Sequence, residues 1–166
     1  MAADEDRGGA LWRFALTVYQ KPGVSDACLL LQDHYGCNVP LLLFAAWAGA
    51  ACSVALTADE VAAAGKAVGP WHGEVVESLR VVRRRLKYGP PPAPDEATAK
   101  LRARIQAIEI DAERIELETL VGFLPERRND IGATATSENL ALAAPTAGDT
   151  ESSDALRTIA IAALSP

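Results

Sequence analysis

The sequence predicts an all-α fold: a compact multi-helix bundle with a central apolar helix, a long C-terminal helix and a flexible tail. Apolar residues recur at intervals of three and four through most of the chain, and no stretch alternates apolar with polar residues over a useful length. Glycine, proline and capping residues divide this pattern into segments of helical length. With 166 residues, 49% of them hydrophobic, the chain is long enough for one domain with its own core.

Two helices are expected at the start of the chain. The first covers about residues 10–20 and ends at Lys21-Pro22-Gly23, because proline cannot continue a helix. The second covers about residues 24–35, and Gly36 stands where a left-handed residue commonly ends a helix. Asn38 then has the position of a helix cap.

The third helix is predicted to be the centre of the bundle. The twenty residues between Asn38 and Asp59 carry no charge, a length that could cross a bilayer. Seven of them are alanine, however, and no cluster of Lys or Arg closely flanks either end. We therefore expect a buried helix and no membrane span.

Three further helices are expected before residue 125. Thr57 and Glu60 form a capping-box pattern that starts an alanine-rich helix ending near Gly69, and Pro70 starts the next helix. A stiff connector, residues 89–94, precedes the longest helix, which has two apolar faces. Such a helix is either sandwiched in a core or shared with a second chain. The apolar stripe of the helix after Pro70 is Trp71, Val75, Leu79, Val82 and Leu86, and one face of the longest helix carries Leu101, Ile105, Ile108, Ala112 and Ile115.

These elements give a simple domain organisation. Residues 1–9 are expected to be a disordered N-terminus, and residues 10–124 a single helical domain that includes the proline-rich connector. Residues 125–166 are rich in Ala, Thr, Ser and Gly and are expected to be mostly a flexible tail, with a short helix over 154–164 that either docks or recruits another protein.

The charges are unevenly distributed. The net charge is −6, and the excess of acidic residues falls entirely after residue 88. If the connector folds the two long helices into a hairpin, eight basic residues gather at one end, with the acidic run 109–118 out of their reach. This cluster is either a solvated helix face, a site for a protein partner or a second copy, or a nucleic-acid site. Nucleic acid is disfavoured, because the protein is acidic and only Tyr88 could stack on a base. The eight candidate partner-binding residues are Arg80, Arg83, Arg84, Arg85, Lys87, Lys100, Arg102 and Arg104.

One polar group could hold a ligand or support chemistry. Gln32, Asp33, His34 and Cys37 lie together at the end of the second helix, and a Cys–His pair can supply an activated nucleophile. Residues so close in sequence usually point to different sides of a helix end, however, and a histidine there is favoured by the helix dipole alone. The cysteine and histidine spacing matches no zinc pattern, so we expect no metal and no cofactor. The odd number of cysteines, three, favours reduced thiols and a cytoplasmic location.

Two stretches of the chain resemble a known family. Leu11-Trp12-Arg13-Phe14-Ala15-Leu16 with the residues that follow as far as Trp47, and the later pattern from Trp71 to Lys87, resemble a family of short, mostly proteobacterial proteins with only a domain-of-unknown-function label. The resemblance implies no catalytic residue, substrate or cofactor. It draws attention to Gln32, Asp33 and the arginines from Arg80 to Arg84.

We therefore expect a non-enzymatic helical interaction or accessory protein that binds a protein partner or itself. The first alternative is a small-molecule-binding or enzymatic domain with a site near Gln32, Asp33, His34 and Cys37. The second is nucleic-acid binding by the basic end of the hairpin, which would weaken steeply with salt.

Overall fold

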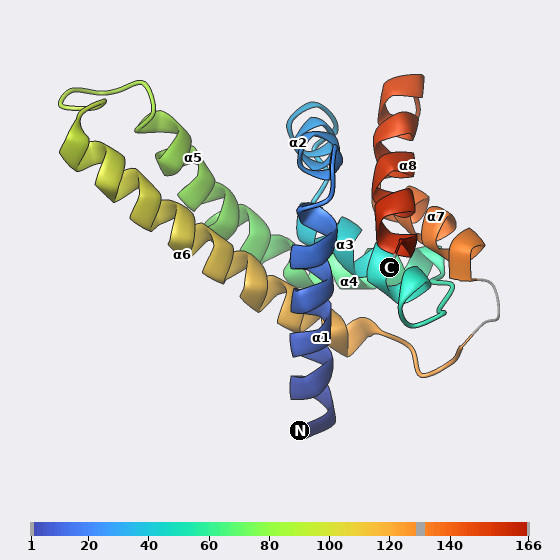
Figure 1. Ribbon diagram of the computed structural model, residues 1–166. Coiled ribbons are helices and arrows are strands. Elements are labelled where there is room, and N and C mark those ends of the chain that lie inside the picture. Colours follow the sequence, from blue (N-terminus) through green and yellow to red (C-terminus); the bar gives the residue numbers. More distant parts are fainter. Residues whose placement is uncertain (1, 129–131, 166) are drawn as a thin grey trace. The chain divides into compact units, whose positions relative to one another are not determined.

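The computed structural model describes residues 2–128 and 132–165, and within these ranges every regular element is a helix, which confirms the predicted all-α class (Figure 1). The chain divides into two compact units, Met1–Lys66 with Leu117–Pro166, and Ala67–Glu116. No described helix has both the length and the apolar character needed to cross a bilayer. The elements are α1 Ala2–Tyr19, α2 Val24–Tyr35, α3 Val39–Ala50, α4 Ala58–Trp71, the π-helix η1 His72–Val76, α5 Glu77–Arg85, α6 Glu96–Leu120, the 3-10 turn η2 Val121–Phe123, α7 Gly132–Ala143 and α8 Thr150–Leu164.

The apolar helix α3 is the centre of the first unit, as the sequence predicts. All its residues from Val39 to Gly49 are buried, and it contacts α1, α2, α7 and α8. Gly49 allows the backbone of α7 to approach closely: a Cβ atom at this position would lie 2.5 Å from the Cα of Thr136. The small residues of α3 therefore set the distance between the two helices.

Three of the predicted helix ends in the first unit are confirmed by their capping residues. Gly36 has a φ of 65°, and the side chain of Asn38 accepts a bond from the backbone N–H of Leu41 at 2.9 Å. Thr57 and Glu60 bond each other's backbone N–H groups, which completes the capping box at the start of α4. These ends were predictable because each depends on residues adjacent in the sequence.

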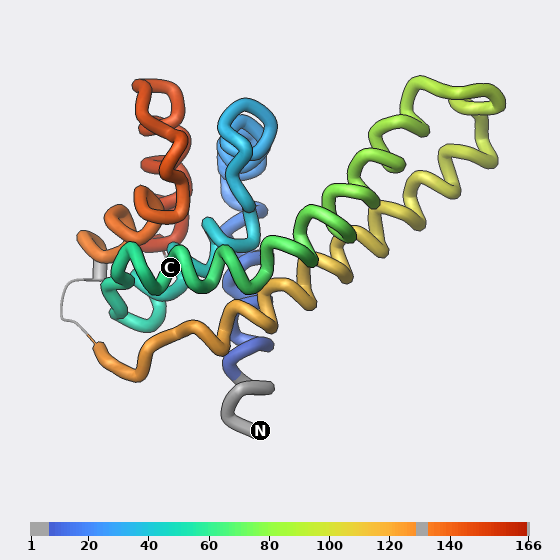
Figure 2. The backbone as a smooth tube through the Cα atoms, turned by 180° about the vertical axis from the view of Figure 1, so that it is seen from behind, coloured from blue at the N-terminus to red at the C-terminus, as the bar shows by residue number. Residues whose placement is uncertain are grey.

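Much of the expected flexible tail instead forms two helices packed in the first unit. α7 packs against α3, and α8 packs against α2 and α7, as the tube in Figure 2 also shows for α7 and α8. Leu140 and Ile159 are buried, and the side chain of Asp149 caps α8. The predicted helix over 154–164 exists and starts earlier, at Thr150. The small Ala, Thr and Ser residues that suggested a tail are the ones that allow this close packing. At the other end, the backbone expected to be disordered over residues 2–9 belongs to α1.

A buried amide of α7 bonds to α3 and to the segment that follows α3. Asn139 Oδ1 accepts a bond from the backbone N–H of Leu56 at 2.8 Å, and Asn139 Nδ2 donates to the carbonyl oxygens of Val54 at 2.8 Å and Ala45 at 3.2 Å. The side chain thereby satisfies backbone groups of the irregular segment that follows α3.

The second unit is a helical hairpin, in which α5 and α6 run antiparallel and are joined by the proline-rich connector (Figure 1). The predicted helix boundary at Gly69 and Pro70 is wrong, because α4 continues through Pro70 to Trp71. Proline removes one backbone donor and crowds the preceding turn. Directly afterwards the chain widens into the π-helix η1 before α5 begins.

Candidate functional site

A row of buried charges fills the space between the two helices of the hairpin. Arg80 donates from Nε to Oε1 of Glu109 at 2.9 Å and from NH2 to Oε1 of Glu113 at 2.8 Å. Arg83 donates from Nε to Oε2 of Glu109 at 2.5 Å. Arg80 is only 7% exposed and Glu109 only 4%. We refer to this row, together with the contacts of His72, as the charged seam.

The charged seam continues toward the start of the hairpin. His72 Nδ1 lies 3.0 Å from Oε2 of the buried Glu116, and the indole nitrogen of Trp71 donates to the backbone oxygen of Ala112 at 3.0 Å. Burial raises the pKa of Glu113, and Arg80 opposes this shift by favouring the charged carboxylate. Since these contacts join residues level with one another on antiparallel helices, they fix the register of the hairpin.

The expectation that the acidic run lies out of reach of all eight basic residues is therefore wrong for Arg80 and Arg83. Glu109 and Glu113 belong to the acidic run that we expected to lie out of reach of the basic end, yet they bind Arg80 and Arg83. Long arginine and glutamate side chains bridge facing helices that lie side by side. These two arginines hold the hairpin together, which is a structural role that the sequence analysis missed.

Several large apolar residues of the hairpin, in contrast, are turned outward. Val82 is 48% exposed and Ile108 52%, and Leu101 and Ile115 are also exposed. On α6 the half-buried Arg102 and the buried Glu109 and Glu116 are spaced by seven residues, and the exposed apolar residues Leu101, Ile108 and Ile115 each precede one of them. The apolar stripe is therefore turned by about 100° from the helix interface.

The segment Trp71–Leu86 has the same offset. Its buried positions His72, Val76 and Arg80 each follow a stripe residue by one position. Because the two helices run antiparallel, an equal offset in sequence turns both stripes toward the same side of the hairpin. The bond from Trp71 to the backbone of α6 agrees with this placement. The two stripes form one surface, here named the apolar face. Its exposed members are Trp71, Val82, Leu101, Ile108 and Ile115, its half-buried members are Val75, Leu79, Leu86 and Ile105, and Ala112 is buried.

The opposite face of the hairpin is mostly polar or small. It carries Glu77, Arg84 and Gln106, with Val81 and Ile110 as exposed apolar exceptions. Ile110 is 41% exposed and stands two positions from Ile108 on the same helix. The two isoleucines therefore have similar exposure and face opposite sides.

Most of the remaining predicted basic residues lie at the surface of the hairpin. Arg84, Arg85 and Arg104 are exposed, as are Lys87 and Lys100. Lys100 pairs with Glu96 at 2.7 Å, and the ammonium group of Lys87 lies 5.2 Å from the centre of the Tyr88 ring. Arg102 is half-buried, and its Nε atom is buried without a hydrogen-bond partner.

The four residues of the alternative site differ in their exposure. Asp33 and His34 are exposed, Gln32 donates to Asp33 at 2.9 Å along the surface, and Cys37 is buried. Burial also raises the pKa of the Cys37 thiol, which disfavours the nucleophilic thiolate.

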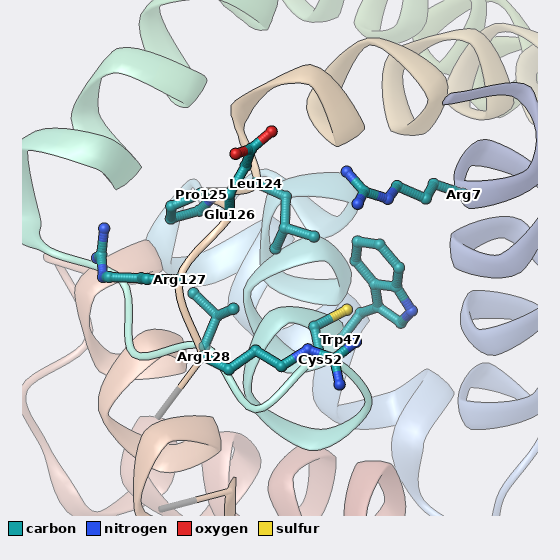
Figure 3. A pocket seen from close by; sticks show the side chains of 9 residues that line it. Arg7, Trp47, Cys52, Leu124, Pro125, Glu126, Arg127 and Arg128 are labelled. Carbon is teal, nitrogen blue, oxygen red and sulfur yellow. The ribbon is translucent and has the colours of Figure 1, made fainter. Parts of the chain in front are cut away.

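A small pocket of about 190 Å³ lies in the first unit, beside the segment that follows η2 (Figure 3). Trp47, Val54 and Leu124 form its apolar wall, and Arg7 and Arg128 extend toward it. Cys52 also borders it, and the pKa of this thiol is raised by burial, against the effect of both arginines. The third arginine at the pocket, Arg127, is bound to Glu60 and to the backbone of Ala55.

Comparison with known proteins gives a family and no assigned activity. Across the described ranges, no group of three or more His, Cys, Asp or Glu residues could hold a metal ion. No curated protein and no solved structure matches the chain. A family model matches residues 10–120, which include both stretches that carry the resemblance, and the chain therefore belongs to the family described as protein of unknown function, DUF2390.

Proposed function

We propose that this protein is a helical interaction module without catalytic activity, which binds a protein partner or itself through the apolar face of the hairpin. The observation that carries the proposal is the inverted arrangement of the hairpin: ion pairs occupy much of its interior, whereas five large residues of the apolar face are exposed, namely Trp71, Val82, Leu101, Ile108 and Ile115. A cytoplasmic location forms part of the proposal and is supported by the odd number of cysteines, three, which favours reduced thiols.

The size of the apolar face supports binding of a macromolecule. About fifteen residues of each arm of the hairpin contribute, over 71–86 and 101–115, which corresponds to a length of roughly 20 Å at a rise of about 1.5 Å per residue. Two neighbouring helices span roughly another 20 Å, so the face covers about 400 Å² in projection. Continuous exposed apolar patches of this order on soluble proteins commonly mark interaction sites.

The physical reason for binding is the removal of these side chains from water. Covering exposed apolar surface is favourable by about 25 cal/mol per Å², and the ion pairs beneath it keep the two helices in place while it is covered. The flat shape of two parallel rows suits another helix or pair of helices.

Site-specific photo-crosslinking in the native cell tests this function. A photoreactive amino acid replaces Ile108 in one variant and Ile110 in a matched control, since both positions are exposed on α6 and face opposite sides. We expect a specific adduct, to this chain or to another protein, only from position 108. Equal adducts from both positions, or none from position 108, would contradict the proposal.

A further inference from the structure

We propose that the occupant of the apolar face is a second copy of this chain, so that two hairpins stack into an antiparallel four-helix bundle. This inference rests on the proposed function, because it names the partner of the same surface. Three features of the hairpin support it: the arrangement of its apolar rows, the distribution of charge along its length, and the charges that border the face.

The apolar rows have the form of half a four-helix bundle. On α6, Leu101, Ile105, Ile108, Ala112 and Ile115 follow one another at steps of four and three, the spacing of a bundle core. In the register set by the charged seam, the apolar stripe of the segment Trp71–Leu86 runs beside this row. A hairpin with such a face is self-complementary, as a symmetric dimer requires.

Two symmetric ways of stacking the hairpins differ in the direction of the second copy. A two-fold axis across the hairpin places α6 against α6 of the second copy and α5 against α5, with every neighbouring pair antiparallel. An axis along the hairpin instead places the two connectors at the same end. The first arrangement brings Val82 and Ile108 close to the axis, because Ile108 is the middle residue of its stripe and Val82 lies level with it in the register set by the ion pairs to Glu109.

The charge along the hairpin favours the antiparallel arrangement. Residues 83–104, near the connector, include seven Lys or Arg and two Asp or Glu. Residues 72–82 and 105–116, at the other end, include two Arg and six Asp or Glu. Antiparallel stacking sets the basic end of one copy beside the acidic end of the other, whereas the alternative sets two basic ends together.

Charged residues at the border of the apolar face also favour the antiparallel arrangement over the alternative. Arg104 and Asp111 are both exposed, flank the α6 stripe and are seven residues apart, with Ile108 close to their midpoint. An axis near Ile108 therefore brings Arg104 of each copy close to Asp111 of the other, twice in each dimer. The alternative stacking would place Arg104 beside Arg85 of the second copy.

The face is at the small end of specific interfaces. The two copies contribute about 800 Å² in projection, and the protruding side chains add to this area, whereas standard interfaces bury about 1,600 Å² of accessible surface in total. We therefore expect a reversible dimer that dissociates at micromolar concentrations.

Sedimentation velocity of the purified full-length chain tests the dimer. From about 1 to about 300 μM, the mass should rise from 17.5 kDa toward twice this value. Ile108→Asp should weaken the dimer at least about 100-fold, since each dimer would bury two carboxylates, and Ile110→Asp should change it less than about 3-fold. Far-UV circular dichroism should show both variants as helical as the parent chain. A strict monomer at the highest concentration, or equal effects of the two variants, would overturn the inference.

A charge exchange tests the antiparallel direction. Arg104→Asp or Asp111→Arg alone should weaken the dimer roughly 10-fold at low salt, because each creates two like-charge contacts. The double variant Arg104→Asp with Asp111→Arg should recover the parent affinity to within about 3-fold. Double-variant affinity no better than that of the singles would refute this direction.

The failures of this inference and of the proposed function can be told apart. A purified chain that stays monomeric, combined with an adduct from position 108 to a different protein, overturns the second copy as occupant and leaves the interaction function in place. A monomeric chain without any adduct from position 108 overturns both.

Discussion

The buried amide of Asn139 offers a direct test of how the C-terminal segment is held in the first unit. Replacing it by alanine removes the bonds to Leu56, Val54 and Ala45 together. Asn139 is fully buried, so the freed backbone groups lie away from bulk water. We therefore expect the variant Asn139→Ala to weaken the attachment of α7 and to destabilise the whole unit.

The size of the effect follows from the groups left without partners. The N–H of Leu56 and the carbonyl of Val54 lose the bonds described above, whereas Ala45 lies within α3, where its carbonyl can also accept a helical bond. Each buried backbone group left unpaired costs about 1–3 kcal/mol. We expect a loss of about 4 kcal/mol, which corresponds to a fall in Tm of roughly 8–16 °C for a chain of this size.

Urea denaturation measures this loss, followed by the fluorescence of the tryptophans and by circular dichroism. The matched control is Glu138→Ala, an exposed neighbour on the same helix, which should change the stability by less than about 0.5 kcal/mol. If Asn139→Ala costs less than about 1 kcal/mol, the three bonds do not hold α7 in solution, and the tail behaves as its composition suggested.

Two further predictions concern the first unit and the continuation of α4. Gly49→Ala should destabilise the protein by about 1–3 kcal/mol in thermal melts, since its Cβ would collide with the backbone of Thr136, whereas Gly69→Ala, in open space, should be neutral or stabilising by up to about 1 kcal/mol. Equal effects would show that α3 and α7 are not in close contact. The bond from Arg127 lowers the pKa of Glu60 from 4.5 to about 2, so the stability it contributes is present above pH 4.5 and is lost as the pH falls toward 2. Glu60→Gln should therefore have a lower Tm than the parent chain at pH 7, and a difference that persists unchanged at pH 2 would contradict this assignment.

Local signals in the sequence predicted most of the helix ends. Gly36, Asn38 and the pair Thr57 and Glu60 act on residues within a few positions, so their effect can be inferred without the rest of the fold. Pro70 is the exception, because the adjoining π-helix accommodates it within a longer helical segment.

The C-terminal helices could not be predicted in this way, because their stability depends on distant partners. The segment around Asn139 has few large apolar residues, and its small side chains resemble those of a flexible tail. Its burial depends on Gly49 and on the backbone of Val54, more than eighty positions earlier in the chain. Composition alone does not contain this pairing.

The hairpin illustrates a different limit, since periodicity shows which residues share a helix face and does not show which face meets the neighbouring helix. Periodicity correctly identifies the apolar stripe of each helix. Since apolar residues usually pack between helices, one would expect the two stripes to face each other. Arg80, Glu109 and Arg83 occupy the facing positions instead. The sequence does contain a signal for this arrangement: residues of opposite charge stand next to the apolar stripe on both helices.

In this inverted arrangement, charged positions of the two helices set the register of the hairpin, and the neighbouring apolar positions are left to bind a partner. Ion pairs such as Arg80 with Glu109 and Glu113 define one register, because their geometry allows little sliding, although their net contribution to stability is small once desolvation is included. The exposed apolar residues are then not needed for contact between the two helices of the hairpin. A rotation of each helix by about 100° would bury the two apolar stripes against each other. The hairpin would then no longer expose this apolar surface for a partner to cover. The charged seam opposes that rotation, and it thereby keeps the apolar face available to a partner.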